Sequence, residues 1–388
     1  MRIADFRLPI FDRRRDKRLG ALMALAVSSC VAAGCATGST PADRFDKARL
    51  RRNALECLKT AIRYEHNPVV RSEAVEALEA VASEEVRPWI RSALLDEHPG
   101  VRFAACMAVG RLRDASAESG LRTRLEDANA SVRVAALYAL HRLGRTEQTG
   151  RLTGYLLYAA DAAVRRNAAI AIALLDEPSG VKVLARAMKD SDAGVRQHAL
   201  EGMARLGNKE ARQELTFMAN SGVGSEEVFA LTALAATSDP VYEDTFRYKL
   251  ATGTHFETRL AAARGLGKLR HPSPLAKGGL GGALQREGAG GADDEGLAVA
   301  LEGLKLQRPP RDDPDDPGSD QLLRIHQLAA SAAGAIGRAE ALPALANLLE
   351  RSGDPRVQVS ASGAVLEVLA ADRTRDLPFA TALPPGPK

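Results

Sequence analysis

Apolar residues recur along most of the chain at steps of three and four, the spacing that places side chains on one face of a helix. Between about residues 65 and 370, such stretches alternate with short polar segments rich in Asp, Pro and Gly. No stretch shows the period-two alternation of apolar and polar residues that is typical of strands. The sequence therefore predicts an all-α domain whose helices are each apolar along one stripe and need neighbours to cover it.

One of these helical stretches repeats about every 31 residues, and each copy has an alanine three residues after a position that is usually arginine. We call that position the marked position of its repeat. A small residue that recurs at this period is what stacked helical units need where they approach most closely. The marked positions are Arg71, Arg102, Arg133, Arg165, Arg196, Glu227, Arg259, Glu295, His326 and Gln358, and the alanines are Ala74, Ala105, Ala136, Ala168, Ala199, Ala230, Ala262, Ala298, Ala329 and Ala361.

A second, looser helical pattern accompanies the copies, so each unit is predicted to be a helix pair. Aspartates lie six residues before several marked positions, where a carboxylate accepts hydrogen bonds from free backbone N–H groups at a helix start. The segments between helices are therefore predicted to be turns. The second pattern covers, for example, residues 86–95, 120–125, 152–158, 181–188, 211–218 and 342–349, and the aspartates are Asp96, Asp127, Asp190 and Asp320.

The repeated motif Asp-x-x-x-x-Val-Arg-x-x-Ala-Ala-x-Ala-Leu, seen at residues 96–109, 127–140 and, with one mismatch, 190–203, resembles the HEAT repeat in the short form of the PBS-lyase-like proteins. The Val-Arg pair is absent around Glu227, Glu295 and His326, where only the alanine and the register remain. The resemblance implies an α-solenoid of about ten HEAT-like helix pairs. It also implies a right-handed superhelix whose second helices line a concave surface.

The marked arginines are expected to pair with acidic turn residues of adjacent repeats and so to build the solenoid. A binding surface is expected instead at one, five and nine residues after the marked positions, which should face the superhelix interior. In repeats two to four these positions combine large apolar side chains with an arginine rim, as partner-binding hot spots do. The alternative is that the same side chains fill the grooves between repeats. The candidate residues are Phe103, Met107, Arg111, Val134, Tyr138, Arg142 and Ile170.

The N-terminal residues have the pattern of a segment removed during export, with a basic stretch at residues 13–18 followed by an apolar run that ends at Cys35. Charge and length predict a signal peptide over residues 1–34. The residues before Cys35 resemble the lipobox of bacterial lipoproteins, which implies diacylglycerol on this cysteine and anchoring to a cell-envelope membrane, facing the periplasm or in the outer membrane. Cys30 follows a second segment that fits the lipobox and is an alternative lipidation site. Cleavage of the signal peptide without lipidation is a further alternative.

The remaining organisation follows from composition. Residues 35–64 are predicted to form an anchor linker and an N-terminal capping helix, and residues 65–370 the solenoid. Gly- and Pro-rich interruptions are predicted at about 271–292 and 307–320. Residues 371–388 are predicted to be a disordered tail.

Charge and composition argue against several classes of function. The formal net charge is +4, but residues 1–34 hold seven basic and three acidic side chains, so the processed chain is near neutral and offers no field for nucleic acid. Seven histidines lie scattered without metal-ligand spacing, and no catalytic or nucleotide-binding motif occurs. Cys57 and Cys106 are expected to be buried thiols. We therefore expect no metal and no cofactor.

These observations predict a non-catalytic scaffold that binds a protein partner and is anchored by lipid in a bacterial cell envelope. Two alternatives remain open. The repeat subtype includes enzymes that attach bilin chromophores to phycobiliproteins, and a purely structural envelope spacer would need no partner.

Overall fold

The computed structural model of this 388-residue chain describes residues 46–270, 290–308 and 318–375. The predicted signal peptide, Cys30, Cys35, most of both predicted interruptions and the end of the tail lie outside these residues. None of the helices in the described ranges is both long and apolar enough to cross a bilayer.

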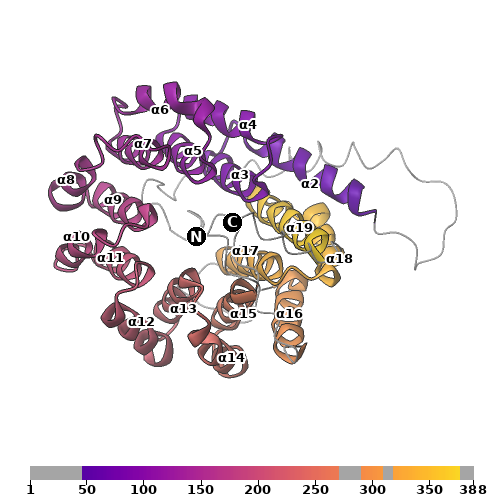
Figure 1. Cartoon of the computed structure of the whole chain (residues 1–388). Coiled ribbons are helices and arrows are strands. Elements are labelled where there is room, and N and C mark those ends of the chain that lie inside the picture. The colour runs from indigo at the N-terminus through magenta and orange to yellow at the C-terminus, as the bar shows by residue number, and fades with distance from the viewer. Residues whose placement is uncertain (1–45, 271–289, 309–317, 376–388) are drawn as a thin grey trace, which may run out of the picture.

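The described residues form nine pairs of helices and no strand, which confirms the all-α solenoid. Figure 1 shows an outer helix and an inner helix in each pair. The outer helices are α2 (Lys47–Ala61), α4 (Arg87–Ser92), α6 (Glu118–Arg124), α8 (Arg151–Tyr158), α10 (Gly180–Ala187), α12 (Lys209–Ser221), α14 (Glu243–Thr252), α16 (Gly290–Lys305) and α18 (Leu342–Arg351). The inner helices are α3 (Pro68–Val81), α5 (Pro99–Leu112), α7 (Ala130–Arg142), α9 (Ala162–Leu175), α11 (Ala193–Arg205), α13 (Ser225–Thr237), α15 (Phe256–Arg270), α17 (Gly318–Ile336) and α19 (Pro355–Arg375).

The inner helices are the ones that carry the marked positions, with one exception. Glu295 lies on the outer helix α16, and Ala298 is exposed, whereas the other nine repeat alanines are fully buried. The prediction of about ten pairs therefore counted one too many among the described residues. Its cause is the long interval after α15, which places an outer helix in register with the repeat.

Five inner helices, from α3 to α11, begin with side-chain caps four residues before the marked positions. Each of these caps accepts a hydrogen bond from a backbone N–H in the first turn, which is otherwise without a partner. Three of the aspartates six residues before the marked positions, Asp96, Asp127 and Asp190, instead stabilise the turn itself, as when Asp96 Oδ1 accepts from the His98 N–H at 2.8 Å; the fourth, Asp320, lies within α17. The prediction that these aspartates cap the helices was therefore wrong by two residues. The observed caps are Asn67, His98, Asn129, Asp161 and Asp192.

Seven inner helices, all except α15 and α19, end close to a position eleven residues after the marked residue, where the backbone is left-handed. Gly144 and Gly207 adopt φ values of 84° and 92°, which glycine tolerates without a Cβ clash. Elsewhere a residue with a side chain takes the same conformation and accepts some strain. The residues with a side chain at this offset are Ala82, Arg113, Asp176 and Ser238, and the third glycine is Gly337.

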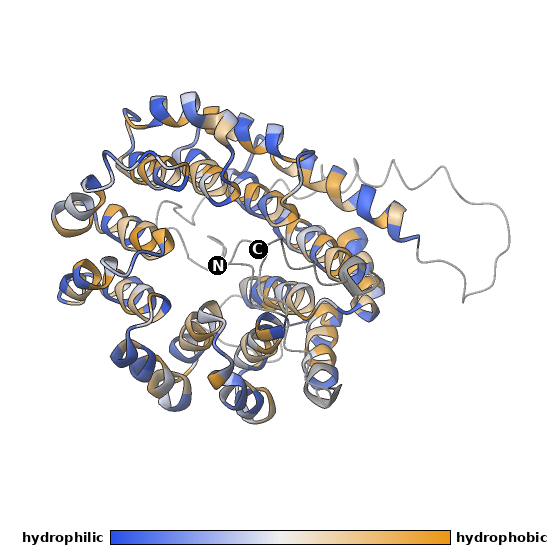
Figure 2. Cartoon of the chain, in the orientation of Figure 1, coloured by the Kyte–Doolittle hydropathy of each residue, from blue (hydrophilic) through white to orange (hydrophobic). Residues whose placement is uncertain are grey.

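The solenoid closes into a ring. Each inner helix packs against the next, and the last inner helix, α19, packs against α17 and also against α2 and α3 at the start of the array (Figure 1). The inner helices are largely apolar, whereas outer helices such as α12 carry mostly hydrophilic residues (Figure 2). The capping helix predicted before the repeats is thus α2, which covers the last helix as well as the first inner one.

Polar contacts join the two ends of the chain at this closure. Lys47 of α2 forms an ion pair with Asp372 of α19 at 2.5 Å, and Gln327 Nε2 of α17 donates to Glu73 Oε1 of α3 at 3.3 Å. Burial between these helices raises the pKa of Glu73 to about 8, against the opposing effect of the nearby Arg356 charge. Helix α19 continues to Arg375, so the predicted boundary of the tail at residue 371 was too early.

Candidate functional site

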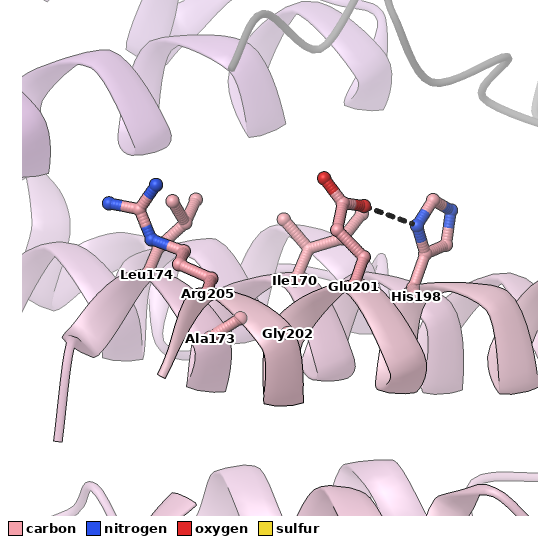
Figure 3. Close-up of a pocket in the computed structure, with 7 residues that line it drawn as sticks. All are labelled: Ile170, Ala173, Leu174, His198, Glu201, Gly202 and Arg205. Atoms are coloured by element: carbon pink, nitrogen blue, oxygen red, sulfur yellow. Dashed lines mark hydrogen bonds and ion pairs between the residues drawn. The ribbon is translucent and has the colours of Figure 1, made fainter. Parts of the chain in front are cut away.

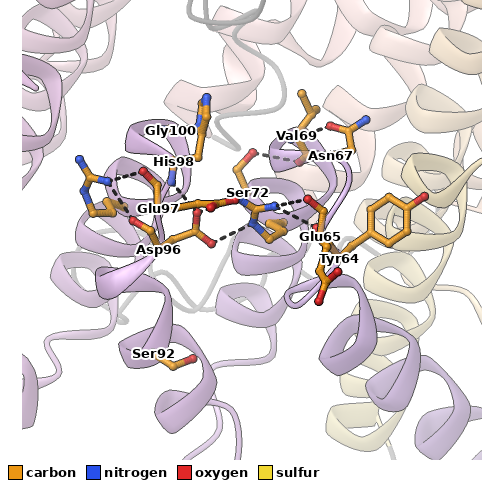
Figure 4. A network of polar contacts seen from close by, with 12 residues as sticks. Tyr64, Glu65, Asn67, Val69, Ser72, Ser92, Asp96, Glu97, His98 and Gly100 are labelled. Carbon is orange, nitrogen blue, oxygen red and sulfur yellow. Dashed lines mark hydrogen bonds and ion pairs between the residues drawn. The ribbon is translucent and has the colours of Figure 1, made fainter. Parts of the chain in front are cut away.

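Three of the marked arginines, Arg71, Arg102 and Arg165, form a ladder with acidic turn residues of the next repeat, as the sequence predicted. Figure 4 shows the contacts around Tyr64 and Asp96. Arg71 makes two hydrogen bonds to the Asp96 carboxylate, at 2.8 and 2.9 Å, and donates to the Tyr64 carbonyl at 2.9 Å. Arg102 repeats the arrangement on Asp127, with both bonds at 2.8 Å. Each of these arginines therefore joins the carbonyls of the turn before its own helix to the acidic turn that follows its own repeat.

The planar guanidinium suits this position because it offers paired donors to a carboxylate and further donors to carbonyls. Hydrogen bonds from Arg165, at 2.7 and 2.9 Å, lower the pKa of Asp190. Burial raises the pKa of Asp127, but the hydrogen bonds from Arg102 and the Asn129 N–H lower it more, so the net shift is downward. The ladder is a structural element, and it occupies the donors of these arginines within the fold.

Three repeats with a marked arginine depart from this pattern and keep a carbonyl contact; in one of them Arg259 donates to the Leu250 carbonyl at 3.2 Å. Arg133 donates to the Tyr155 hydroxyl at 3.0 Å in place of a carboxylate. Arg196 donates to the carbonyls of Asp190 and Ser191, at 2.7 and 2.9 Å, and has no carboxylate partner among the described residues.

In the sixth repeat the ladder has its charges reversed. The marked residue is Glu227, and Lys249 of α14 lies 2.6 Å from its Oε1 atom and donates to the Asn220 carbonyl at 3.3 Å. Thr258 donates to the other oxygen of Glu227 at 2.7 Å. Lys249 therefore does for this repeat what arginine does elsewhere. Sequence reasoning missed it because the lysine follows the marked residue by 22 positions and the aspartates follow by 25.

The apolar residues predicted to form an exposed binding patch are buried. Phe103, Met107, Val134 and Tyr138 are at most 1% exposed and Ile170 is 9% exposed, so the prediction that they are exposed was wrong. The structure instead supports the alternative that they fill the space between repeats. No observation tests whether these residues contact a partner.

Tyr138 shows why helical spacing misassigned this face. Its ring lies against α5 at Gly110, so close that a Cβ added to Gly110 would stand 2.8 Å from the ring and from the Cα of Ala139. The fifth position after a marked residue thus packs onto the neighbouring inner helix.

The two predicted rim arginines lie at the C-terminal ends of their helices and differ in their partners. The guanidinium of Arg111 pairs with the carboxylate of Glu79 on α3, with one contact at 2.5 Å. Arg142 has no hydrogen-bond or ion-pair partner in the described part of the chain, and its Nε atom is buried. Sequence reasoning named both arginines but gave no sign of this difference.

A small pocket lies on α9 and α11 (Figure 3). His198 Nδ1 and Glu201 Oε2 are 3.5 Å apart, and Arg205 Nε lies 3.2 Å from Asp176 Oδ1. The cavity volume is about 10 Å³, about enough for one water. The pocket is lined by Ile170, Ala173, Leu174, His198, Glu201, Gly202 and Arg205.

Other reactive groups are spread through the fold. Cys57 and Cys106 are buried free thiols, and burial raises the pKa of Cys106 to about 12. No group of three or more His, Cys, Asp or Glu side chains within the described ranges is placed to hold a metal ion.

Comparisons with known proteins agree with this architecture. Residues 55–141 and 151–228 match the family model for HEAT repeats. No curated protein sequence matches the chain.

Several solved structures match this chain at low identity and low TM-score. Human deoxyhypusine hydroxylase, in complex with glycerol, is 15% identical, with a TM-score of 0.35, over 83% of this chain and 98% of that one. The complex of CpcE and CpcF of phycocyanin lyase from Nostoc sp. is 17% identical, with a TM-score of 0.39, over 63% of this chain and 95% of that one. Kap121p bound to Pho4p is 15% identical, with a TM-score of 0.32, over 90% of this chain and 41% of that one. Residues 55–141 and 151–228 thus contain HEAT repeats, and the described helices form an all-α solenoid.

Proposed function

We propose that this chain is a non-catalytic scaffold that binds a protein partner through its inner helices. HEAT-repeat solenoids are suited to this role because stacked units present a long, continuous surface. The observation that carries the proposal is the ring of inner helices. It holds arginines such as Arg142 at fixed positions, while the ladder arginines are already occupied within the fold.

The partner surface is tested by site-specific photo-crosslinking in native membranes. A benzoyl-phenylalanine at Thr232, on the inner helix α13, should capture one recurrent protein. The matched control carries the same group at Phe217, on the outer helix α12 and 70% exposed, and should not enrich that protein. Equal capture from both positions, or no saturable capture from Thr232, would contradict the scaffold.

We also propose that the mature chain is attached to a bacterial envelope membrane by lipid on Cys35. The support is the basic and apolar N-terminal sequence and the small residues before this cysteine. Metabolic labelling with an alkyne fatty acid should label the wild type and Cys30→Ser, and Cys35→Ser should abolish the label and release the protein from membranes. The reverse result would assign Cys30, and label on neither cysteine would leave a plain exported protein.

The bilin-lyase alternative has a direct test of its own. Incubation of the purified protein with a free bilin and an acceptor phycobiliprotein subunit should give no covalent coloured product. A product that absorbs visible light after denaturation would replace the scaffold with the enzyme.

A further inference from the structure

Three arginines occupy the same place in their repeats, nine residues after the marked position at the end of an inner helix. They are Arg111, Arg142 and Arg205. Two of them are neutralised by an acid from the preceding inner helix or its cap. Arg111 pairs with Glu79, 32 residues earlier, and Arg205 pairs with Asp176, 29 residues earlier.

Arg142 lacks such an acid because of what the preceding repeat offers. The residue 32 positions before it is Gly110, and the residue 29 positions before it is Arg113. Neither can accept a hydrogen bond through its side chain. Nε of Arg142 is buried without a hydrogen-bond partner in the described ranges. Burial has therefore desolvated this part of the guanidinium, and no hydrogen bond within those ranges replaces the one to water.

Arg142 lies in a cluster of charged groups on neighbouring inner helices. Tyr138 lies one turn earlier on α7, and its hydroxyl also has no hydrogen-bond partner among the described residues. Burial raises the pKa of Tyr138, while the charges of Arg111, Arg142 and Arg205 act to lower it and only Glu79 adds to the rise. The carboxylates of Glu76 and Glu79 act on Arg111, and Asp176 pairs with Arg205, so Arg142 is the one guanidinium of the three without an acid in contact in the part of the chain that the structure describes.

We propose that Arg142, together with the Tyr138 hydroxyl, binds a carboxylate from an acidic peptide segment of the partner. A single guanidinium without an acid in contact matches one carboxylate better than a dianion such as phosphate. The guanidinium forms paired bonds to a carboxylate, as Arg102 does with Asp127 inside the ladder. This inference rests on the proposed scaffold function and names the chemistry that its partner presents.

The test measures binding of a fluorescein-labelled hexaglutamate peptide to the detergent-solubilised full-length protein by fluorescence anisotropy at low salt. Arg142→Gln should weaken binding at least tenfold, and Tyr138→Phe, which keeps the ring, should weaken it a few-fold. Arg142→Lys should give an intermediate affinity, because it keeps the charge and loses the fork. The matched control is Arg145→Gln, three residues on, where the side chain pairs with Glu118 at 3.1 Å and is exposed; it should bind within twofold of wild type.

The outcomes separate this inference from the proposed function. Hexaglutamate binding by Arg142→Gln within twofold of wild type, with unchanged melting, overturns the assignment of Arg142. If inorganic phosphate displaces the peptide when both supply the same concentration of negative charge, the site binds small anions, and the assignment of an acidic peptide is overturned. In crosslinking from Thr232, a partner captured equally by wild type and Arg142→Gln overturns the inference alone, whereas no capture by wild type overturns the scaffold.

Discussion

Lys249→Met should destabilise the fold far more than Arg247→Met, although the two cations lie two residues apart on α14. Lys249 and Glu227 are 2.6 Å apart with side chains 9% and 6% exposed. Arg247 and Glu243 are also 2.6 Å apart, one turn apart on the same helix, but their side chains are 41% and 28% exposed. The two variants therefore compare a buried ion pair with a solvated one at nearly equal distance.

Burial sets the expected magnitudes. Removing one partner of a buried ion pair leaves a charge without compensation and costs about 3–5 kcal/mol, and we expect about 3 kcal/mol because Thr258 still donates to Glu227. An exposed pair one helical turn apart contributes about 0.3–0.5 kcal/mol. The double variant Glu227→Gln with Lys249→Met removes the stranded charge and should recover about half of the loss.

Urea unfolding followed by far-UV circular dichroism at pH 7 measures these differences, and the slope of the free energy against urea should stay unchanged. Hydrogen exchange should show the loss of protection first in α13, α14 and α15, which meet at this pair. Unfolding free energies for the two single variants within about 0.5 kcal/mol of each other would refute the reasoning from burial.

Three further changes probe packing and pH. Gly110→Ala should lower the free energy of unfolding by about 1–3 kcal/mol, because the added Cβ would lie 2.8 Å from the backbone of α7. Gly154→Ala on α8, where the added Cβ meets nothing within 4 Å, should raise it by about 0.5–1 kcal/mol. Urea unfolding measures both. Arg165 lowers the pKa of Asp190 below its usual 3.8, so the ionised carboxylate stabilises the fold above pH 3.8. This stabilisation is lost as the pH falls further. In an acid titration of stability, Asp190→Asn should therefore lose less stability below pH 3.8 than the wild type. The pKa of Glu73 is raised to about 8, so the folded state keeps a proton that the unfolded state releases near pH 4.5. The free energy of unfolding should therefore fall as the pH rises from about 4.5 to about 8. Glu73→Gln should make the free energy of unfolding less dependent on pH over this range.

Each of these predictions has an opposite outcome. Equal stability of the two alanine variants would mean that α5 and α7 are farther apart than described. Parallel acid curves for wild type and Asp190→Asn would remove the ladder pair as a source of acid sensitivity. A wild-type stability that rises between pH 5 and 8 would show that Glu73 is ionised at the closure.

The repeat, the helix pairs and the ladder were predictable because each depends on residues at fixed offsets. An arginine and an aspartate 25 residues later meet wherever both are present, as Arg71 and Asp96 do. The burial of Tyr138 was not predictable, because helical spacing gives the face of a side chain but not the distance to the next helix. That distance is set here by Gly110, a residue in another repeat.

Ring closure also lies beyond a local pattern. It depends on the small rotation between each pair and the next, summed over all the pairs, and no single residue encodes it. The contacts of Lys47 with Asp372 and of Glu73 with Gln327 join residues 325 and 254 positions apart, which no periodic signal links. Arg142 stood out only once the structure showed which of its counterparts had acids opposite them.

A linear array of repeats has two ends, and it melts by fraying from either one, since an end unit has only a single neighbour to lose. A closed array has no end to fray from, because α19 meets α2 and α3. The first unit to unfold must give up two neighbouring interfaces, and each later unit gives up one. We therefore expect this chain to unfold all at once, and to tolerate the deletion of a whole helix pair poorly, because eight pairs at the same rotation would leave the circle open.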